Sequence, residues 1–368
     1  MRLATVEPDE AGLERIELIW RALEHRSRPS YFLTWGWIEN WLAMLPPDQR
    51  PVLGVLRDHD RIAGALFLGR QSLVRHRVVP SRALYANATG VTGYDELCIE
   101  HNQILGDPIS IRQLIEVLPD DWDELCLPGF DARVLGEVPD GHRVVVEREV
   151  AAPFVDLAQV RAAGDYLALL SANTRAQIRR ARRRVARDDR GRESARDGGL
   201  VLDVATTTSE ALAIFDELVA LHAASWQTRG EPGAFADPWF EQFHRRLIER
   251  RFAHGEIWLA RLRAGRRTMG CLYNFVIGDR VLFYQSGLAH DDDPVVKPGL
   301  LCHAAAIERC ARDGLAVYDL LGGDARYKAS LATGATRLAW VRVQRPRLRF
   351  AIEDRVRQWK HALVEAWS

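Results

Sequence analysis

The chain has 368 residues, of which 47% are hydrophobic and 27% charged. That length allows two ordinary domains, and the composition is globular, which excludes a disordered chain. Fifty Lys and Arg balance fifty Asp and Glu, so no net field draws the whole protein to nucleic acid or to an anionic membrane. Because we find neither a secretory signal nor an apolar run of about eighteen residues, we expect a cytoplasmic protein.

The cysteines indicate neither a disulfide framework nor a metal site. Five are present, at positions 98, 126, 271, 302 and 310, an odd number without C-x-x-C spacing, so we expect them reduced and buried. Cys302, His303 and Cys310 lack the close spacing of zinc ligands. We therefore expect no metal.

In chain order, the first half predicts two helices, a hairpin, and then a strand, a helix and a strand. The expected helices are 13–25, 34–45 and 109–118; the hairpin is 52–56 with 62–68; the other strands are 82–87, 96–99 and 124–127. The alternation of apolar residues and the turn residues between the runs support these assignments.

A basic segment follows. Nine arginines and only two acids lie between Arg175 and Arg192. A thin apolar stripe predicts a helix with an arginine-rich outer face; it comprises Leu167, Leu170, Thr174, Ile178, Ala181 and Val185. The helix is either a solvated connector or a patch for phosphates of CoA, of tRNA or of a sugar nucleotide. Residues 191–199 should be a flexible link.

The second half repeats the order of the first. Helices are expected at 209–226, 238–251 and 300–313, a hairpin at 257–262 with 269–277, and strands at 281–288 and 316–321. The hairpins share their spacing of Arg, Arg, Gly and Leu, at 57, 61, 64 and 66 and again at 263, 267, 270 and 272. We expect an α/β (α+β) protein that uses the order β-α-α-β-β-β-α-β twice. Its domains should be 1–160 and 201–345, with a connector at 161–200 and a C-terminal helix at 346–368.

The segment before the helix 300–313 has the features of a phosphate site. Pro298 and Gly299 let the backbone turn and leave the first helical N–H groups unpaired, and Lys297 adds a positive charge. Such a helix start attracts anions. The alternative is that Pro-Gly only punctuates a strand-helix connection.

Several motifs together resemble one known family. They are H-A-A-S-W-Q-T-R-G-E-P-G-A-F at 222–235, F-Y-Q-S-G at 283–287, P-G-L-L at 298–301, Y-D-L-L-G-G-D at 318–324 and Y-K at 327–328. They are similar to the GNAT-superfamily acetyltransferases called CelD-like or BioF2-like (Acetyltransf_6), relatives of the FemAB aminoacyl transferases. The resemblance covers most of residues 165–345 and implies a tandem duplicated GNAT fold with two mixed sheets flanked by helices.

The resemblance also implies where acyl-CoA binds. It places the cofactor between the strands 281–288 and 316–321, with its pyrophosphate at Lys297, Gly299, Leu300 and Leu301. Lys297 departs from the family, which usually has Ser before Pro-Gly. Three acids at 291–293 are unusual neighbours for an anion; they either pair with Lys297 or bind a cationic acceptor.

Amine acylation requires a group that takes the amine proton and donors for the oxyanion and the leaving thiolate. The candidates are Asp319 as proton acceptor, Lys328 for the oxyanion, and Tyr327 or Tyr284 as proton donor. A purely structural role stays open for Asp319 and Lys328. The motif also contains no G-x-S-x-G elbow, so no covalent serine intermediate is expected.

The resemblance also implies that the loop between the helices 209–226 and 238–251 forms the acceptor side. Arg229 offers a two-pronged contact for a carboxylate or phosphate, or else only stacks on Trp226. His222 lies four residues before Trp226 and is either a base or a buried structural histidine.

The resemblance thus implies an N-acyltransferase that moves an acyl group, acetyl in the simplest case, from acyl-CoA to an amine acceptor by direct attack. The acceptor should carry an acid or a sugar, in polysaccharide or cell-envelope metabolism; the family name points to cellulose biosynthesis without establishing it. The alternatives are a FemAB-like transferase that uses aminoacyl-tRNA and a non-catalytic GNAT-fold binding protein. The first half carries Asp107 near its expected helix start, where an anion would require a cation.

Overall fold

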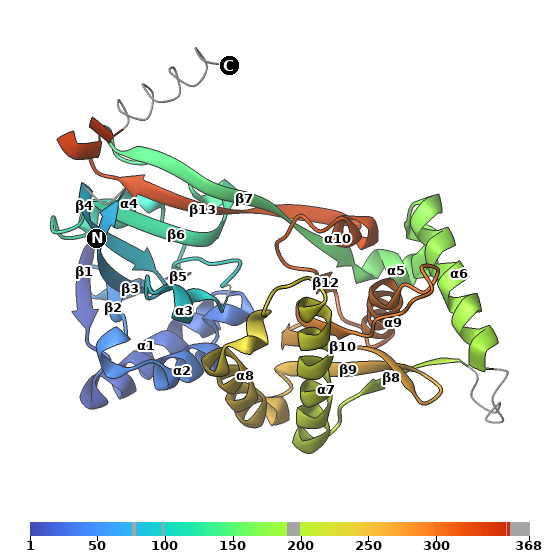
Figure 1. Cartoon of the computed structure of the whole chain (residues 1–368). Coiled ribbons are helices and arrows are strands. Elements are labelled where there is room, and N and C mark those ends of the chain that lie inside the picture. Colours follow the sequence, from blue (N-terminus) through green and yellow to red (C-terminus); the bar gives the residue numbers. More distant parts are fainter. Residues whose placement is uncertain (76–78, 98, 190–198, 351, 354–368) are drawn as a thin grey trace, which may run out of the picture. The chain divides into compact units, whose positions relative to one another are not determined.

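The computed structural model describes residues 1–75, 79–97, 99–189, 199–350 and 352–353. Cys98, the expected link up to residue 198 and most of the expected helix 346–368 lie outside the described residues. The chain divides into two compact units, Met1–Glu149 with Arg337–Ser368, and Val150–Thr336 (Figure 1). Each unit contains a mixed sheet with helices against it.

The first unit has a sheet in the order β1-β2-β3-β4-β6-β13, in which β4 and β6 run parallel. Its elements are β1 (Arg2–Val6), α1 (Glu10–Arg26), α2 (Trp35–Met44), β2 (Val52–Asp58), β3 (Arg61–Arg75), β4 (Val79–Ala86), α3 (Thr92–Asp95), β5 (Leu105–Gly106), α4 (Ile111–Val117), β6 (Glu124–Asp131) and most of β13 (Gly334–Gln344).

The second unit has a sheet in the order β7-β12-β11-β10-β9-β8. Its elements are the end of β7 (Arg143–Asp156), α5 (Leu157–Ala163), α6 (Ala172–Asp189), β8 (Leu200–Val204), α7 (Thr208–Gln227), α8 (Pro238–Arg251), β9 (Ile257–Ala264), β10 (Arg267–Ile277), β11 (Arg280–Leu288), α9 (Pro298–Arg312), β12 (Val317–Asp319) and α10 (Arg326–Leu331).

The two units confirm the repeated element order. The series β1, α1, α2, β2, β3, β4, α4, β6 corresponds to β8, α7, α8, β9, β10, β11, α9, β12. Both hairpins even share a bulge, one residue before Gly64 and one residue before Gly270. A Cβ atom at Gly64 would lie 2.8 Å from Ile109, and one at Gly270 would lie 2.8 Å from Leu288. The shared spacing therefore reflects a shared packing requirement.

Some expected elements are wrong. The described residues 96, 97 and 99 of the expected strand 96–99 form no strand, because the chain makes the short helix α3 and then a turn at 96–97. The carboxylate of Asp95 holds that loop by accepting the N–H groups of Thr89 and Gly90, at 2.8 and 2.7 Å. The strand expected at 316–321 shortens to β12, and the glycine turn after it leads into α10.

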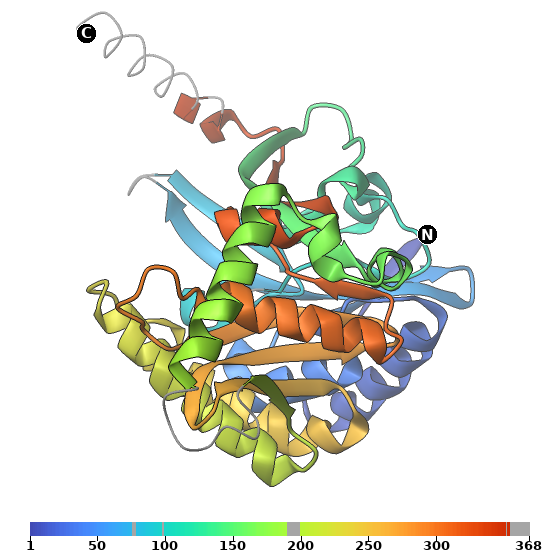
Figure 2. The ribbon, with the colours of Figure 1, turned by 90° about the vertical axis from the view of Figure 1, so that its right-hand side faces the viewer.

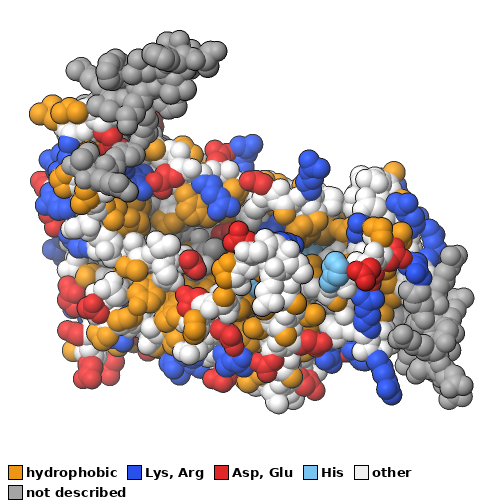
Figure 3. Space-filling model, viewed as in Figure 1, with side chains coloured by type: hydrophobic (Ala, Val, Ile, Leu, Met, Phe, Trp, Pro, Cys, Tyr) orange, Lys and Arg blue, Asp and Glu red, His pale blue; other side chains and the backbone are white. Residues whose placement is uncertain are grey.

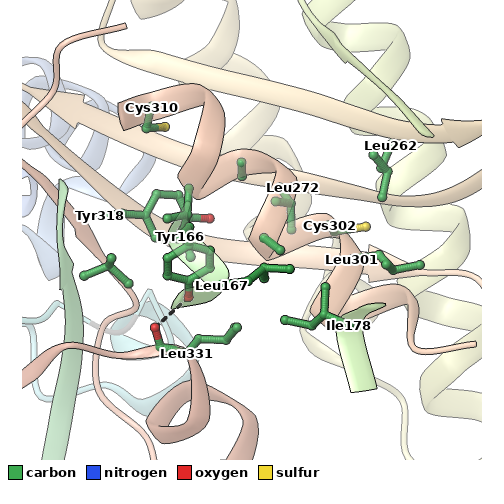
Figure 4. Packing of buried hydrophobic residues seen from close by; sticks show 14 of the residues in the cluster. Tyr166, Leu167, Ile178, Leu262, Leu272, Leu301, Cys302, Cys310, Tyr318 and Leu331 are labelled. Carbon is green, nitrogen blue, oxygen red and sulfur yellow. Dashed lines mark hydrogen bonds between the residues drawn. The ribbon is translucent and has the colours of Figure 1, made fainter. Parts of the chain in front are cut away.

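In the second unit, α7 and α8 cover one face of the sheet, whereas α5, α6 and α9 cover the other (Figures 1 and 2). The core on the α9 side includes Leu301 and Cys302 of α9, which are 1% and 0% exposed. The hydroxyl of the buried Tyr166 donates to the carbonyl oxygen of Leu331 at 2.6 Å and so connects α10 to this core (Figure 4).

The basic segment forms α6, and all six residues of its expected apolar stripe are buried. Three arginines bind it to the rest of the unit. Arg179 pairs with Asp165 at 3.4 Å, Arg182 with Glu308 at 2.9 Å and Arg184 with Asp293 at 2.6 Å. Three further arginines of this helix, Arg175, Arg180 and Arg183, have no ion-pair partner among the described residues.

Four described cysteines are buried and unpaired. Within the part of the chain that the structure describes, no group of three or more His, Cys, Asp or Glu side chains forms a metal-binding cluster. Nor does any described helix combine the length and the hydropathy required to span a bilayer.

Candidate functional site

The central feature of the second unit is the separation of β11 from β12. The two strands pair in parallel over three positions only, ending at Leu282 opposite Asp319. β11 continues to Leu288 and stays paired with β10 on its other side. Residues 283–288 therefore present one backbone edge without a strand partner among the described strands. Unpaired N–H and C=O groups of this kind are available to a ligand that carries amides.

Helix α9 begins beside this open edge and has no side-chain cap. Its first intrahelical bond runs from the N–H of Leu301 to the carbonyl of Lys297, at 3.0 Å. The N–H groups of Gly299 and Leu300 precede that bond, and Lys297 is exposed. Of the four candidates, Leu301 contributes to the core rather than to the open helix start.

The three acids before α9 do not pair with Lys297. Asp291 pairs with Arg267 at 2.7 Å, and Asp293 pairs with Arg184. Asp292 lies 3.2 Å from His290. Since arginines engage two of these carboxylates and the third lies beside His290, none of the three neutralises Lys297 at the helix start. Figure 3 shows Lys and Arg side chains close to Asp and Glu side chains at the right-hand edge of the molecule.

The corresponding gap in the first unit is closed by the chain itself. β4 and β6 also pair over three positions. Beyond them, the side-chain amide of Asn102 donates to the carbonyls of Ala86 and Pro128, at 3.1 and 2.9 Å. The start of α4 is also capped, by Ser110 together with Gln113. The first unit thus lacks both features of the second: the open edge and the uncapped helix.

The turn after β12 is held by two of the candidate catalytic residues. Asp319 is 2% exposed; its carboxylate pairs with Arg280 at 3.0 Å and accepts the N–H of Leu321 at 2.9 Å. Leu321 has a φ of +56°, a conformation that is costly for a residue with a side chain. The ammonium of Lys328 donates to the carbonyl of Gly322 at 2.8 Å. Both charged groups therefore stabilise the turn.

Tyr327 lies on the α9 side of the sheet. Its ring stacks on His303 with 5.5 Å between the ring centroids, and Phe283 meets His303 edge-on at 4.4 Å. The ammonium of Lys328 lies 5.8 Å from the Phe283 ring. Burial raises the pKa of Tyr327 to about 12, so this phenol keeps its proton at neutral pH and is a poor proton donor.

Tyr284 lies on the other side, in a bulge of β11. Tyr273 pairs with Gln285 and Asn274 with Phe283, so Tyr284 is the extra residue. Its hydroxyl lies 3.1 Å from Nε2 of His244 on α8. Bulges direct a side chain away from the regular pleat, and this one brings the partly buried Tyr284 hydroxyl to a buried histidine.

The end of α7 and the residues after it bring Trp226, Arg229 and His222 together, the three residues expected to face the acceptor. The Arg229 guanidinium lies 5.3 Å from the centroid of the Trp226 ring, and His222 packs on that ring at 5.7 Å. Arg229 is exposed and has no ion-pair partner among the described residues. His222 is 4% exposed, and its Nδ1 has no hydrogen-bond partner in that part of the chain.

Three histidines of this unit are neutral at physiological pH. Burial lowers the pKa of His244 and of His303 to about 3, with the Lys328 charge adding to the shift of His303. Burial, together with the Arg229 charge, lowers the pKa of His222 to about 4. A base of such low pKa removes an ammonium proton poorly at pH 7.

Sequence reasoning missed two partners of the candidate residues, His244 and Arg280. His244 lies four residues after Phe240 on the apolar face of α8, a position typical of a core histidine. No sequence signal joins it to Tyr284, forty residues further on. For Arg280, a signal was present: it begins β11, the strand that pairs with the strand carrying Asp319.

Comparisons with known proteins agree with this architecture. Residues 172–329 match the model of an acetyltransferase (GNAT) domain. FemX has a similar structure, with a TM-score of 0.54 and 9% identity over 92% of this chain and 97% of that one.

Two further solved structures are similar as well. A C-terminal domain assigned to lysylphosphatidylglycerol synthetase from Agrobacterium fabrum has a TM-score of 0.52 and 14% identity over 94% of this chain and 96% of that one. L-PGS from Bacillus licheniformis has a TM-score of 0.50 and 10% identity over 95% of each chain. At these identities the likeness concerns the fold. No curated protein matches the sequence. The match over 172–329, together with the repeated element order and the open edge beside an uncapped helix, shows that these residues form a GNAT acetyltransferase domain and that the chain is an acyltransferase.

Proposed function

We propose that the second unit transfers an acyl group, acetyl in the simplest case, from acyl-CoA to an amine. The observation that carries this proposal is the open edge of β11 directly before the uncapped start of α9. An extended chain with amide groups can pair with such an edge, and its phosphates can accept the N–H groups of Gly299 and Leu300 beside Lys297. The residues present therefore fit the pantetheine arm and pyrophosphate of CoA.

Bound acyl-CoA supplies the acyl group as a thioester, and the chain binds, orients and protonates. In this reaction the amine nitrogen forms a bond to the carbonyl carbon, the C–S bond breaks, and the proton that leaves nitrogen ends on sulfur. Tyr284 donates the proton to sulfur and regains one from the nitrogen, directly or through water. Tyr327, with its high pKa, remains a hydrogen-bond donor. Asp319 and Lys328 hold the turn after β12.

The acceptor enters beside the loop between α7 and α8. Arg229 is exposed on Trp226 without an acidic partner among the described residues. A guanidinium in this position binds a carboxylate or phosphate in two-pronged geometry. We therefore assign the acceptor to amines that carry an acidic group, such as amino acids or acidic amino sugars; a role in polysaccharide or cell-envelope metabolism rests on the family resemblance alone.

Calorimetric titration with acetyl-CoA, and then with longer acyl-CoA, tests the donor site. A Lys297→Glu/Gly299→Asp double variant places two carboxylates at the helix start and should abolish binding through charge repulsion. An Arg266→Glu/Gly199→Asp variant places two carboxylates elsewhere in the unit, where a Cβ at Gly199 meets nothing within 4 Å, and should bind like the original. Equal binding by both variants would place CoA elsewhere.

A second candidate function is aminoacyl transfer from charged tRNA. It is supported by the fold shared with FemX and by the arginines at 175, 180 and 183, for which the described residues provide no acidic partner. If no acyl-CoA binds, filter binding of aminoacylated tRNA is the next measurement. The Arg180→Glu/Arg183→Glu variant should weaken tRNA binding and change no other property of the protein. If neither acyl-CoA nor aminoacylated tRNA binds, a non-catalytic binding protein is favoured.

A further inference from the structure

A buried hydrogen-bond chain connects Tyr273, His244 and Tyr284 across β10, α8 and β11. Nδ1 of His244 lies 3.3 Å from the Tyr273 hydroxyl, and Nε2 lies 3.1 Å from the Tyr284 hydroxyl. His244 and Tyr273 are both 0% exposed, whereas Tyr284 is only partly buried. The chain thus leads from the protein interior to the side chain that we assign as proton donor.

The Tyr273 hydroxyl determines which nitrogen of His244 carries the hydrogen. Among the described residues, His244 is its single hydrogen-bond partner. A phenol O–H that finds no acceptor in the interior costs about 1–3 kcal/mol. Tyr273 therefore donates to Nδ1, which must be unprotonated to accept. Because burial keeps His244 neutral, its one hydrogen is then on Nε2.

We propose that Tyr273 fixes His244 as the Nε2–H tautomer, and that His244 in turn donates a hydrogen bond to the oxygen of Tyr284 and acts as a positioning residue for it. A donated hydrogen bond stabilises the phenolate more than the phenol and so makes Tyr284 a stronger acid. It also directs the Tyr284 hydrogen to an acceptor other than His244. In the opposite tautomer, which carries its hydrogen on Nδ1, the unprotonated Nε2 would accept the hydrogen bond of the Tyr284 hydroxyl.

The surroundings of His244 within this unit favour a fixed tautomer. The rings packed against it come from Phe240 and Phe243 of α8, Tyr273 and Phe275 of β10, Tyr284 of β11 and Phe235. Of these six, only the two tyrosines carry an ionisable group, and burial raises the pKa of Tyr273 well above its ordinary value. The hydrogen-bond pattern is therefore constant between pH 5 and 8.

Nitrogen-15 NMR of protein labelled at histidine reads the tautomer directly, with the His244→Gln variant providing the assignment. The proposal predicts hydrogen on Nε2 in the original protein and a mixture of tautomers in Tyr273→Phe. Hydrogen on Nδ1 in the original protein would overturn it. This readout requires no substrate, so it is decided separately from the proposed acyl transfer, on which only the consequence for Tyr284 rests.

Kinetics test that consequence. Tyr273→Phe should lower kcat about tenfold or more and move the alkaline limb of its pH profile to higher pH, because Tyr284 becomes a weaker acid. His244→Gln, whose amide can replace the Nε2–H donor, should retain more activity than His244→Leu. Tyr166→Phe, which removes a buried hydroxyl bond outside this chain of residues, is the control and should leave the profile in place. An unmoved alkaline limb in Tyr273→Phe would refute the positioning role.

Discussion

Asp319 and Tyr284, both candidate catalytic residues from the sequence, have different surroundings in the structure. Asp319 has a charged partner and a backbone partner and is enclosed, whereas Tyr284 is partly exposed in a bulge. A carboxylate that already accepts an arginine and an amide is stabilised in its charged form and is a weak base. Tyr284 is therefore the better candidate for direct contact with the reacting atoms.

The Asp319→Asn variant separates a structural role from a catalytic one. It removes the ion pair with Arg280 while leaving an oxygen for the N–H of Leu321, so we expect the free energy of unfolding to fall by about 1–3 kcal/mol. The kcat of the folded variant should change by less than about tenfold, because no proton transfer is lost. Arg280→Gln, which removes the same ion pair, should also lower the free energy of unfolding. A hundredfold loss of kcat with unchanged stability would instead identify Asp319 as the base.

The buried histidines predict a pH dependence of stability. In the unfolded chain His244 and His303 titrate near 6.5, whereas burial lowers their folded pKa to about 3. As pH falls below 6.5, the unfolded state binds protons that the folded state does not, so the free energy of unfolding falls. The loss approaches about 1.4 kcal/mol per pH unit for each histidine.

Urea denaturation at pH 7 and pH 5 measures this effect. Between these values, His244→Gln should lose about 2 kcal/mol less than the original protein, because one titrating group has been removed. Equal losses would mean that His244 is protonated in the folded state or exposed to water.

At the scale of elements, the apolar pattern predicted most helices and both hairpins, because those elements bury one face. The pattern did not predict the position of β7 or β13, because strand pairing depends on residues far apart in the chain. It also predicted no helix at the position of α10. That helix depends on the contact of Leu331 with Tyr166, 165 positions earlier. The candidate site residues could be predicted because they lie in local motifs, whereas His244 lies outside those motifs.

The contact between β11 and α7 gives a prediction at this scale. A Cβ atom at Gly287 would lie 2.2 Å from the carbonyl oxygen of Leu218, which is backbone and cannot move aside cheaply. Gly287→Ala should therefore lower the free energy of unfolding by about 1–3 kcal/mol or more. Gly93→Ala, where a Cβ meets nothing within 4 Å, should have little effect. Thermal melts of the two variants decide the matter; similar melting temperatures would show that β11 and α7 can separate without cost.

At the scale of the whole molecule, the chain uses one element order twice and leaves one gap open. In the first unit, Asn102 takes the hydrogen-bond positions between β4 and β6, and Ser110 caps the helix that corresponds to α9. In the second unit both positions stay open. The duplication thus provides an internal control. A ligand that recognises the general fold would bind both units, whereas a ligand that requires the open gap would bind the second unit alone.

Hydrogen–deuterium exchange with and without acetyl-CoA shows whether the ligand binds at the open gap of the second unit alone. We expect slower exchange in peptides from β11 and the start of α9, residues 283–301, since their backbone groups become hydrogen-bonded. Peptides that cover residues 83–87 and 99–104 of the first unit should exchange at the same rate in both conditions. Protection in the first unit alone, or no protection at 283–301 at saturating acetyl-CoA, would contradict this expectation.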